Sequence, residues 1–148
     1  FMTDTHGSGI MNKLFDGYAP WFGPIPQRNT GSLVSDRKGK VTTYACIGMV
    51  DRGELFINVG TDVYDGMIIG ERNRDGDLNV NITREKKLTN MRAAGSDNTV
   101  TLRPPNLLSL DQCIEFIAED ELVEVTPNVI RMRKMELDQN KRAKRKKI

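Results

Sequence analysis

The chain has 148 residues and a net charge of only +2, from 22 Lys and Arg residues against 20 Asp and Glu residues. This length suits one domain, or one domain with part of another, and allows a hydrophobic core without disulfides. No apolar run approaches the roughly 18–20 residues of a membrane-spanning helix, and no Cys or His spacing suits a metal, so neither a membrane partner nor a metal site is expected. Cys46 and Cys113 are predicted to be reduced core residues of a cytoplasmic protein.

The first 30 residues are predicted to lie outside the main domain. The chain opens at Phe1 rather than at a methionine, which indicates a boundary inside a longer protein. Pro20, Pro24 and Pro26 break regular structure, so a linker is expected before residue 31. Four aromatic residues in this segment are predicted to cover a core edge, with stacking on nucleic-acid bases as the alternative: Phe15, Tyr18, Trp21 and Phe22.

The next 50 residues are predicted to be rich in strands. Residues 33–34 and 41–49 suggest two strands joined by a polar turn, although the second segment, through Arg52 and Gly53, is also compatible with a short helix. The β-rich runs at residues 54–59 and 63–70, separated by glycines, indicate a small barrel. Strict alternation at Leu78–Ile82 predicts a strand with one buried face, which Val100 and Leu102 continue after an interruption.

The interruption, residues 83–98, shows no strong periodicity and contains several basic side chains. A long polar loop inside a compact domain is uncommon unless it has a function. By composition, Arg72-Asn73-Arg74 and the run from Arg84 to Arg92 suit phosphate contacts on an irregular RNA surface. The alternative is an ordinary charged loop, since acidic residues such as Glu71 and Glu85 lie nearby.

One helix and one hairpin are predicted after the loop. Ser109 and Gln112 form a capping-box pattern, and an amphipathic helix should follow, docked by the face with these residues: Leu110, Cys113, Ile114 and Ile117. Its outer face and exit carry acidic residues predicted to be solvated: Asp111, Glu115, Glu119, Asp120, Glu121 and Glu124. Residues 122–125 and 129–133 are typical of a hairpin that turns at Pro127-Asn128. The final segment, from Met135, is predicted to be helical in its first turns and then to fray.

The charge is unevenly distributed along the chain. Residues 131–148 contain nine Lys and Arg residues against Glu136 and Asp138, which gives this tail +7; since the whole chain carries +2, residues 1–130 carry −5. A basic arm on an acidic body favours a polyanionic partner, and a solvated tail without a partner is the alternative. The predicted fold is α+β: a mainly antiparallel small barrel with one short amphipathic helix, a long polar loop and a basic tail, divided as 1–30, 31–134 and 135–148.

The residues needed for catalysis are sparse. The only histidine is His6, outside the main domain, so no Ser/His or Cys/His pair can form within it. Asp75 and Asp77 flank a glycine and suit a turn better than acid–base work. Gly7-Ser8-Gly9 lacks the Gly-Lys-Ser/Thr ending of a phosphate-binding loop. No catalytic and no metal-ligating residues are therefore assigned.

Several ordered sequence runs resemble the BipA/TypA family of ribosome-associated translational GTPases. Those before and at the start of the main domain resemble the family just after its elongation-factor-G-like fifth domain begins to close: Gly7–Asn12, Phe15–Pro20 and Arg28–Ser35. Those in the main domain resemble the family's C-terminal domain: Asp51–Phe56, Val63–Gly70, Lys86–Ala93 and Asp120–Pro127. Where family members commonly have His-Ser-Arg, this chain has Arg72-Asn73-Arg74, which keeps a positive charge but not the imidazole.

This resemblance implies a cytoplasmic protein that binds the 70S ribosome, assists ribosome assembly under stress, and contacts 23S rRNA and A-site tRNA through a loop that maps to residues 71–97. It implies that residues 1–30 are a remnant of the preceding domain, and that GTP and Mg²⁺ bind in an N-terminal domain absent from this chain, so no cofactor is expected here. The expected RNA-binding residues are Arg72, Arg74, Asn81, Arg84, Lys86, Lys87, Asn90 and Arg92, assisted by the tail residues Lys141, Arg142, Lys144, Arg145, Lys146 and Lys147. The alternative is a module that braces the other domains of its GTPase, with incidental RNA contact.

Overall fold

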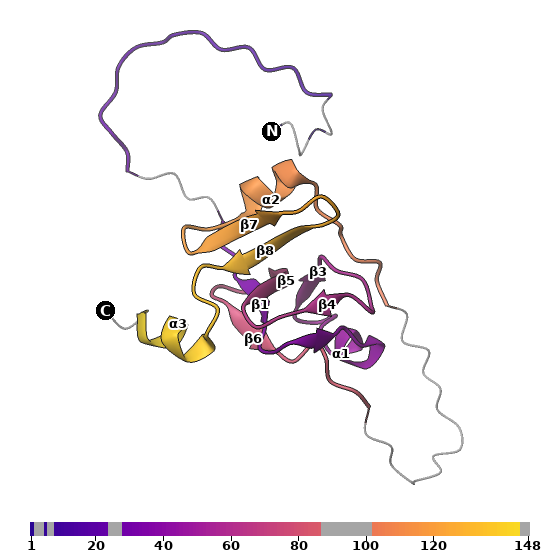
Figure 1. Ribbon diagram of the computed structural model, residues 1–148. Coiled ribbons are helices and arrows are strands. Elements are labelled where there is room, and N and C mark those ends of the chain that lie inside the picture. Colours follow the sequence, from indigo (N-terminus) through magenta and orange to yellow (C-terminus); the bar gives the residue numbers. More distant parts are fainter. Residues whose placement is uncertain (2–4, 6–7, 24–27, 87–101, 146–148) are drawn as a thin grey trace.

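The computed structural model describes residues 1, 5, 8–23, 28–86 and 102–145. The elements of this part of the chain are, in order, β1 (Ser32–Ser35), β2 (Gly39–Lys40), α1 (Thr43–Ile47), β3 (Gly53–Leu55), β4 (Asp62–Val63), β5 (Met67–Arg72), β6 (Leu78–Val80), α2 (Leu110–Phe116), β7 (Glu121–Val125), β8 (Ile130–Lys134) and α3 (Gln139–Arg145). Their arrangement is shown in Figure 1. The predicted α+β class is confirmed.

The main sheet has the strand order β6-β1-β5-β8-β7, with β3 paired to β5 beside this path. Strands β1 and β6 run parallel, whereas the other pairs are antiparallel, so the sheet is mixed. Strands β2 and β4 form a separate two-stranded ladder. Because the strand order ends at β6 and at β7, the sheet formed by the described residues is open, and the small barrel predicted from the short strands is not confirmed.

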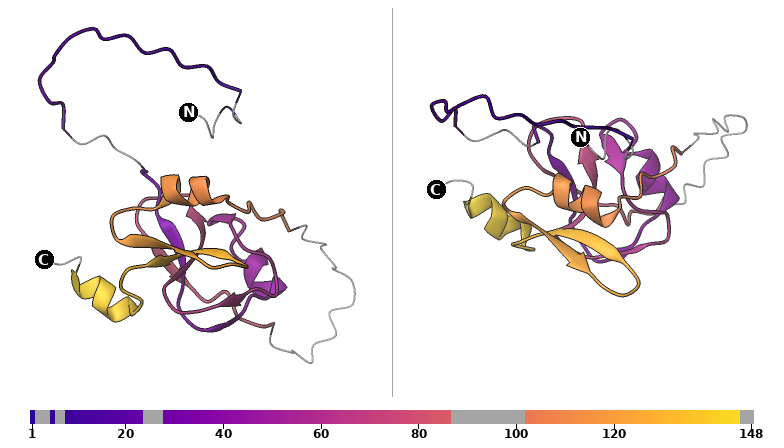
Figure 2. Two further views of the ribbon diagram at one scale, coloured as in Figure 1. Left: turned by 45° about the horizontal axis from the view of Figure 1, so that its top comes forward. Right: turned by 90° about the horizontal axis from the view of Figure 1, so that it is seen from above.

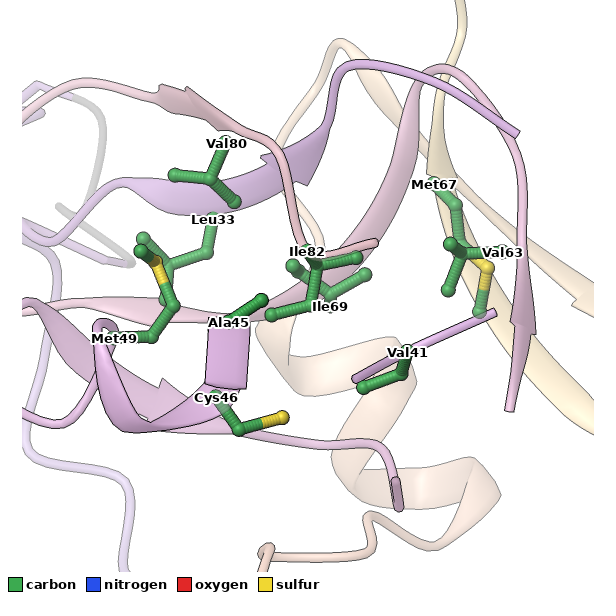
Figure 3. Close-up of a cluster of buried hydrophobic side chains, with 10 residues drawn as sticks. All are labelled: Leu33, Val41, Ala45, Cys46, Met49, Val63, Met67, Ile69, Val80 and Ile82. Atoms are coloured by element: carbon green, nitrogen blue, oxygen red, sulfur yellow. The ribbon is translucent and has the colours of Figure 1, made fainter. Parts of the chain in front are cut away.

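The core lies on both faces of the central strands β1 and β5. One cluster includes Leu33 and Ile69 and is covered by α1 (Figure 3), whereas the other includes Val34 and Ile68 and is covered by α2. Neighbouring residues of a strand point to opposite faces, so an uninterrupted apolar run can fill two clusters. The two helices consequently lie on opposite sides of the sheet, as the views in Figure 2 also show.

The segment predicted as a second strand, residues 41–49, contains helix α1 instead, which was the alternative for this stretch. Thr42 caps the helix, and its hydroxyl accepts a hydrogen bond from the Ala45 N–H at 3.2 Å. A threonine in this position stabilises a helix start because it satisfies a backbone N–H that has no partner within the helix. Ala45 and Cys46 are buried, so α1 contributes to the first core cluster.

Helix α2 begins at the predicted capping box, in which Ser109 and Gln112 exchange side-chain and backbone hydrogen bonds. Its predicted docking face is not confirmed: Leu110 and Ile114 are 38% and 56% exposed. The helix packs on the sheet through Cys113 and Phe116, and through Ile117 at its C-cap. The Phe116 ring contacts the Phe56 ring edge-on, with centroids 5.0 Å apart. The packed face of the helix therefore includes Phe116, which was not among the predicted docking residues.

The predicted hairpin of β7 and β8 is confirmed, with the Thr126 N–H bonded to the Val129 carbonyl in its turn. The tail prediction was wrong in its position, because residues 135–138 precede the helix and α3 starts only at Gln139. Leu137 lies against Gly66, whose φ is +82° and whose added Cβ would come within 2.8 Å of the Leu137 Cα. This close approach, at a conformation that favours glycine, fixes how the chain leaves β8.

The N-terminal segment 8–23 contains no helix or strand and extends away from the sheet (Figure 1). Its aromatic side chains were predicted to cover a core edge, but they are 80% to 99% exposed: Phe15, Tyr18, Trp21 and Phe22. That prediction was wrong because the segment is not packed on the domain, and the rings of Phe15 and Tyr18 instead contact each other at 5.5 Å.

Candidate nucleic-acid interface

The polar segment that follows β6 is anchored at its start by Thr42. The hydroxyl of this N-cap residue donates a hydrogen bond to the Arg84 carbonyl at 2.5 Å, and its backbone N–H donates to the Ile82 carbonyl at 3.2 Å. Where the description of the chain resumes, Leu102 packs against the first core cluster and the Asn106 N–H donates to the Leu55 carbonyl at 2.8 Å. Residues 87–101 are therefore flanked by two segments that are fixed to the domain.

The interval 71–97 is not a single loop, which corrects the loop expected from the family resemblance. Residues 71–72 end β5, and residues 78–80 form β6, which pairs with β1. Between them lies a turn in which the Arg72 guanidinium donates to the carbonyls of Asp75 and Gly76, each at 3.0 Å. The polar run 81–86 is the part of the expected loop that follows the strand within the described residues.

The predicted RNA-binding residues have different environments. Arg72 is engaged by the turn just described, whereas the side chains of Arg74, Arg84 and Lys86 are exposed. Arg74 and Lys86 form no ion pair within the described part of the chain. Lys87, Asn90 and Arg92 lie outside the described residues, and so does Val100, the predicted continuation of the strand.

Asn81 and Arg84 line a groove beside α1, with a volume of about 420 Å³. Sequence reasoning missed its other polar residues, Tyr44, Arg52 and Asn79. The Arg84 guanidinium carbon lies 5.8 Å from the centroid of the Tyr44 ring, and Asn81 accepts hydrogen bonds from the N–H and the hydroxyl of Thr83 at 3.1 and 3.0 Å. The only sequence signal for Tyr44 was the helix alternative for its segment, because a helix brings this side chain to the side of residue 84.

The basic tail is joined to this groove through Arg142. Its Nη2 donates to Asn79 Oδ1 at 2.5 Å, and its Nη1 donates to the Glu136 carbonyl at 2.9 Å and to the Leu137 carbonyl. Lys141 and Lys144 are exposed on α3, which ends at Arg145. Lys146 and Lys147 lie outside the described residues. Arg142 thus docks the tail helix against β6.

A buried ion-pair network on the side of α2 is a further feature that the sequence did not predict. Lys134 is only 1% exposed, and its Nζ lies 2.8 Å from Glu121 Oε1, 2.8 Å from Asp77 Oδ2 and 3.2 Å from Asp120 Oδ1. Glu121 Oε1 also accepts from the Ser32 hydroxyl at 2.6 Å and from Arg28 Nη2 at 3.2 Å. The network joins the segment before β1 to β1, β7, β8 and the turn before β6.

Each central charge of this network is stabilised by its partners against the cost of burial. Burial by itself would raise the pKa of Glu121, but hydrogen bonds from Lys134, Ser32 and the Ala118 N–H lower that pKa below its ordinary value. Burial by itself would lower the pKa of Lys134, but the hydrogen bonds and charges of Asp77 and Glu121 raise it. Both groups are therefore held in their charged forms at neutral pH.

The acidic residues around α2 were predicted to be solvated, but only some of them are. Asp111, Glu115 and Glu119 are exposed, but Glu121 is buried in the network. Glu124 accepts a hydrogen bond from the Tyr64 hydroxyl at 2.6 Å and pairs with Arg133 Nε at 2.7 Å. Burial, together with the hydrogen bond to Glu124, raises the pKa of Tyr64. Part of the predicted acidic rim therefore belongs to the interior.

The described residues contain no group of three or more His, Cys, Asp and Glu side chains placed to hold a metal ion. Cys46 and Cys113 are free and buried, as predicted, and burial raises the pKa of both thiols. His6 lies outside the described residues. No helix in the described part of the chain has the length and apolar character needed to cross a membrane.

The sequence matches known proteins along most of its length. A family model described as the TypA/BipA C-terminal domain matches residues 30–139. The chain is 46% identical over 145 residues to a Bacillus subtilis (strain 168) protein named Large ribosomal subunit assembly factor BipA, covering 97% of the chain and 24% of that relative. A protein of the same name from Salmonella typhimurium is 49% identical over 145 residues, covering 96% and 24%. The Arabidopsis thaliana protein named Putative elongation factor TypA-like SVR3, chloroplastic, is 49% identical over 131 residues, covering 88% and 19%. The chain thus spans about a quarter or less of the length of these relatives.

Proposed function

Because the chain belongs to the TypA/BipA family, we propose that it is the ribosome-binding C-terminal domain of a cytoplasmic translational GTPase that acts in large-subunit assembly and stress adaptation. In this proposal GTP and Mg²⁺ bind elsewhere in the longer protein, and this chain supplies contacts to RNA rather than catalysis. Its partners are the 70S ribosome, 23S rRNA and A-site tRNA. Residues 31–134 form the family-specific domain, and residues 135–148 form an auxiliary basic tail.

The observation that carries this proposal is the fixed basic stem at residues 81–86. The Arg84 carbonyl is bonded to the capped start of α1, while the side chains of Arg84 and Lys86 are exposed. Cations on an anchored backbone can bind phosphates with less loss of conformational freedom than cations on a free chain. The proposed contacts continue along the chain to Lys87, Asn90 and Arg92, with Arg74 exposed on the preceding turn.

The test is co-sedimentation of this chain with 70S ribosomes across a salt series. Changing Lys86 and Lys87 to Ala together is expected to weaken binding and to lower the slope of log affinity against log salt by about 0.7–0.9 for each phosphate that is no longer paired. The physical reason is that each lysine that pairs with a phosphate displaces condensed counterions from the RNA, and the alanine variant no longer does so.

The matched control changes Lys13 and Lys38, two exposed lysines elsewhere in the chain, to Ala. It removes the same charge as the test variant, so a general loss of electrostatic attraction would affect both proteins equally. The proposal requires the larger change in the Lys86/Lys87 variant. Equal affinities and salt slopes in that variant and the unmodified chain would refute the assignment of this stem to RNA binding.

A second candidate function, bracing of the preceding domain, is favoured by Arg28. The guanidinium of this residue lies 4.0 Å from the centroid of the Phe116 ring, donates to the Phe116 carbonyl at 3.0 Å and pairs with Glu121. The segment that enters β1 is thereby held in a defined direction, which would orient any domain before it. Binding that survives the Lys86/Lys87 change but fails after Arg28→Ala would support bracing instead.

A further inference from the structure

The groove beside α1 combines one exposed aromatic ring, two guanidinium groups and two amides. Tyr44 is 41% exposed, and the Arg52 and Arg84 side chains are also exposed. Its apolar floor is formed by Ala45, Met49 and Val80, which belong to the core cluster drawn in Figure 3. No acidic residue is found among the described residues that line it. Its volume of about 420 Å³ falls within the roughly 300–1,000 Å³ typical of small-ligand sites.

Four polar residues of the groove are held in place by hydrogen bonds, through either the backbone or the side chain. Thr42 fixes the backbone of Arg84, Thr83 fixes the Asn81 side chain through its Oδ1, and Arg142 holds Asn79. The Arg52 carbonyl accepts a hydrogen bond from the Asn73 N–H at 2.9 Å. The Asn81 Nδ2 group makes no hydrogen bond within the described part of the chain, so both of its N–H donors are available to a ligand.

We propose that this groove binds one unpaired nucleotide of a single-stranded RNA segment, which deepens and rests on the proposed function. The base stacks against the surface formed by Tyr44 and Arg84. The flanking phosphates pair with Arg52 and Arg84, and the Asn81 amide donates to an acceptor on the base edge. Aromatic and guanidinium planes are the usual platforms for unstacked bases, and nearby cations hold the strand.

The charge and shape of the groove favour this ligand over an apolar peptide. A peptide helix needs a row of apolar anchor pockets, whereas this surface presents guanidinium and amide groups around a single ring. An acidic peptide would satisfy the cations but would leave the ring without a planar partner. A nucleotide supplies the planar base, the edge acceptors and the anion together.

The test measures binding of a 5′-fluorescein-labelled oligoadenylate of eight nucleotides to the 148-residue chain by fluorescence anisotropy. Tyr44→Leu is expected to weaken binding roughly 5- to 150-fold, in line with the measured cost of removing one base-stacking aromatic, while the salt slope stays unchanged. Tyr44→Phe keeps the ring and should remain within about twofold of the unmodified chain. Arg84→Gln should lower the salt slope by about 0.7, since one phosphate of the single strand is no longer paired.

Two outcomes would overturn the proposal. The first is equal affinity of the Tyr44→Leu variant and the unmodified chain, with the same thermal midpoint for both. The second is competition by adenosine monophosphate as effective, nucleotide for nucleotide, as that by unlabelled oligoadenylate, which would assign the groove to free nucleotides instead of a strand. The proposed function is tested separately: ribosome binding that depends on Lys86 and Lys87 but is unaffected by Tyr44→Leu would remove this site and leave the proposed function in place.

Discussion

Replacing Lys134 with Ala is expected to lower the free energy of unfolding by about 3–5 kcal/mol, as measured by urea denaturation at pH 7. The substitution leaves Glu121, whose side chain is 0% exposed, without the ammonium group 2.8 Å away. Asp77 is deprived of the same partner. Glu121 then keeps only Arg28 Nη2, at 3.2 Å, as a cationic partner, and a buried carboxylate that loses its nearer cation costs far more than a broken surface ion pair. The destabilisation should therefore stand out from that of other lysine substitutions.

The pH dependence separates this electrostatic effect from simple loss of packing. The folded pKa of Glu121 is lowered, so its contribution is fully present above its unfolded pKa of about 4.3 and is lost as the pH falls through the folded value. Without Lys134, burial is less opposed and the folded pKa of Glu121 rises. The difference in unfolding free energy between the two proteins should thus shrink between pH 7 and about pH 3. Lys144→Ala, at an exposed position, is the control, with an expected change within about 0.5 kcal/mol at all pH values. A difference that stays constant with pH would contradict the electrostatic explanation.

Local sequence signals predicted those elements that are specified by neighbouring residues. The hairpin turn after Val125, the capping box at Ser109 and the strand at Leu78 each depend on residues fewer than about six positions apart. The segment at 41–49 has mixed signals because alternation and helix formation fit it equally well. The N-cap bond of Thr42 and the burial of Ala45 and Cys46 against the sheet stabilise the helix.

The ion-pair network was not predictable because its partners are distant in the sequence. Arg28 and Glu121 are separated by 93 residues, and a charged side chain in a strand is ordinarily assigned to the solvent face. Lys134 shares its face of β8 with Met132, so the apolar alternation of this strand continues into a lysine. The pairing of β8 with β7 brings Asp120 and Glu121 to its ammonium group, and Asp77 reaches it from the turn before β6, on the other side of β1 and β5.

Only some residues of the proposed RNA groove were predicted, because others come from a separate segment of the chain. Arg84 was selected because it lies in the polar run after the predicted strand, and Asn81 was selected through the family resemblance. Tyr44 and Arg52 come from a separate segment. Its helix, the only sequence signal for Tyr44, was one of two interpretations, and no sequence pattern placed Arg52 beside residue 84. The groove lies next to α1, and the ion-pair network lies on the α2 side of the sheet. The surfaces proposed for RNA contact and for domain bracing are therefore different, and substitutions in one need not disturb the other.

Phe116→Ala is expected to lower the free energy of unfolding by about 2–4 kcal/mol, somewhat less than for a fully buried ring. The substitution removes the edge-on contact with Phe56 and the ring under the Arg28 guanidinium. Phe116→Leu is the matched control, because it keeps most of the apolar volume but has no π face for the cation. Urea denaturation measures both, and the leucine variant should show only part of the destabilisation.

The same two variants report on the entry segment if hydrogen exchange is followed at Ser32, whose N–H is bonded to Asp77 Oδ1 at 3.1 Å beside the Arg28 contact. Exchange at this amide should accelerate more in both Phe116 variants than exchange at Glu124, whose N–H faces the partner strand β8, because the cation is deprived of its aromatic partner in each. A destabilisation below about 1 kcal/mol in Phe116→Ala would show that α2 is not held by this ring. Both variants could instead be destabilised while exchange at Ser32 stays unchanged. Phe116 would then stabilise the core without directing the chain into β1. In that case the proposed bracing would depend on the Arg28–Glu121 pair alone.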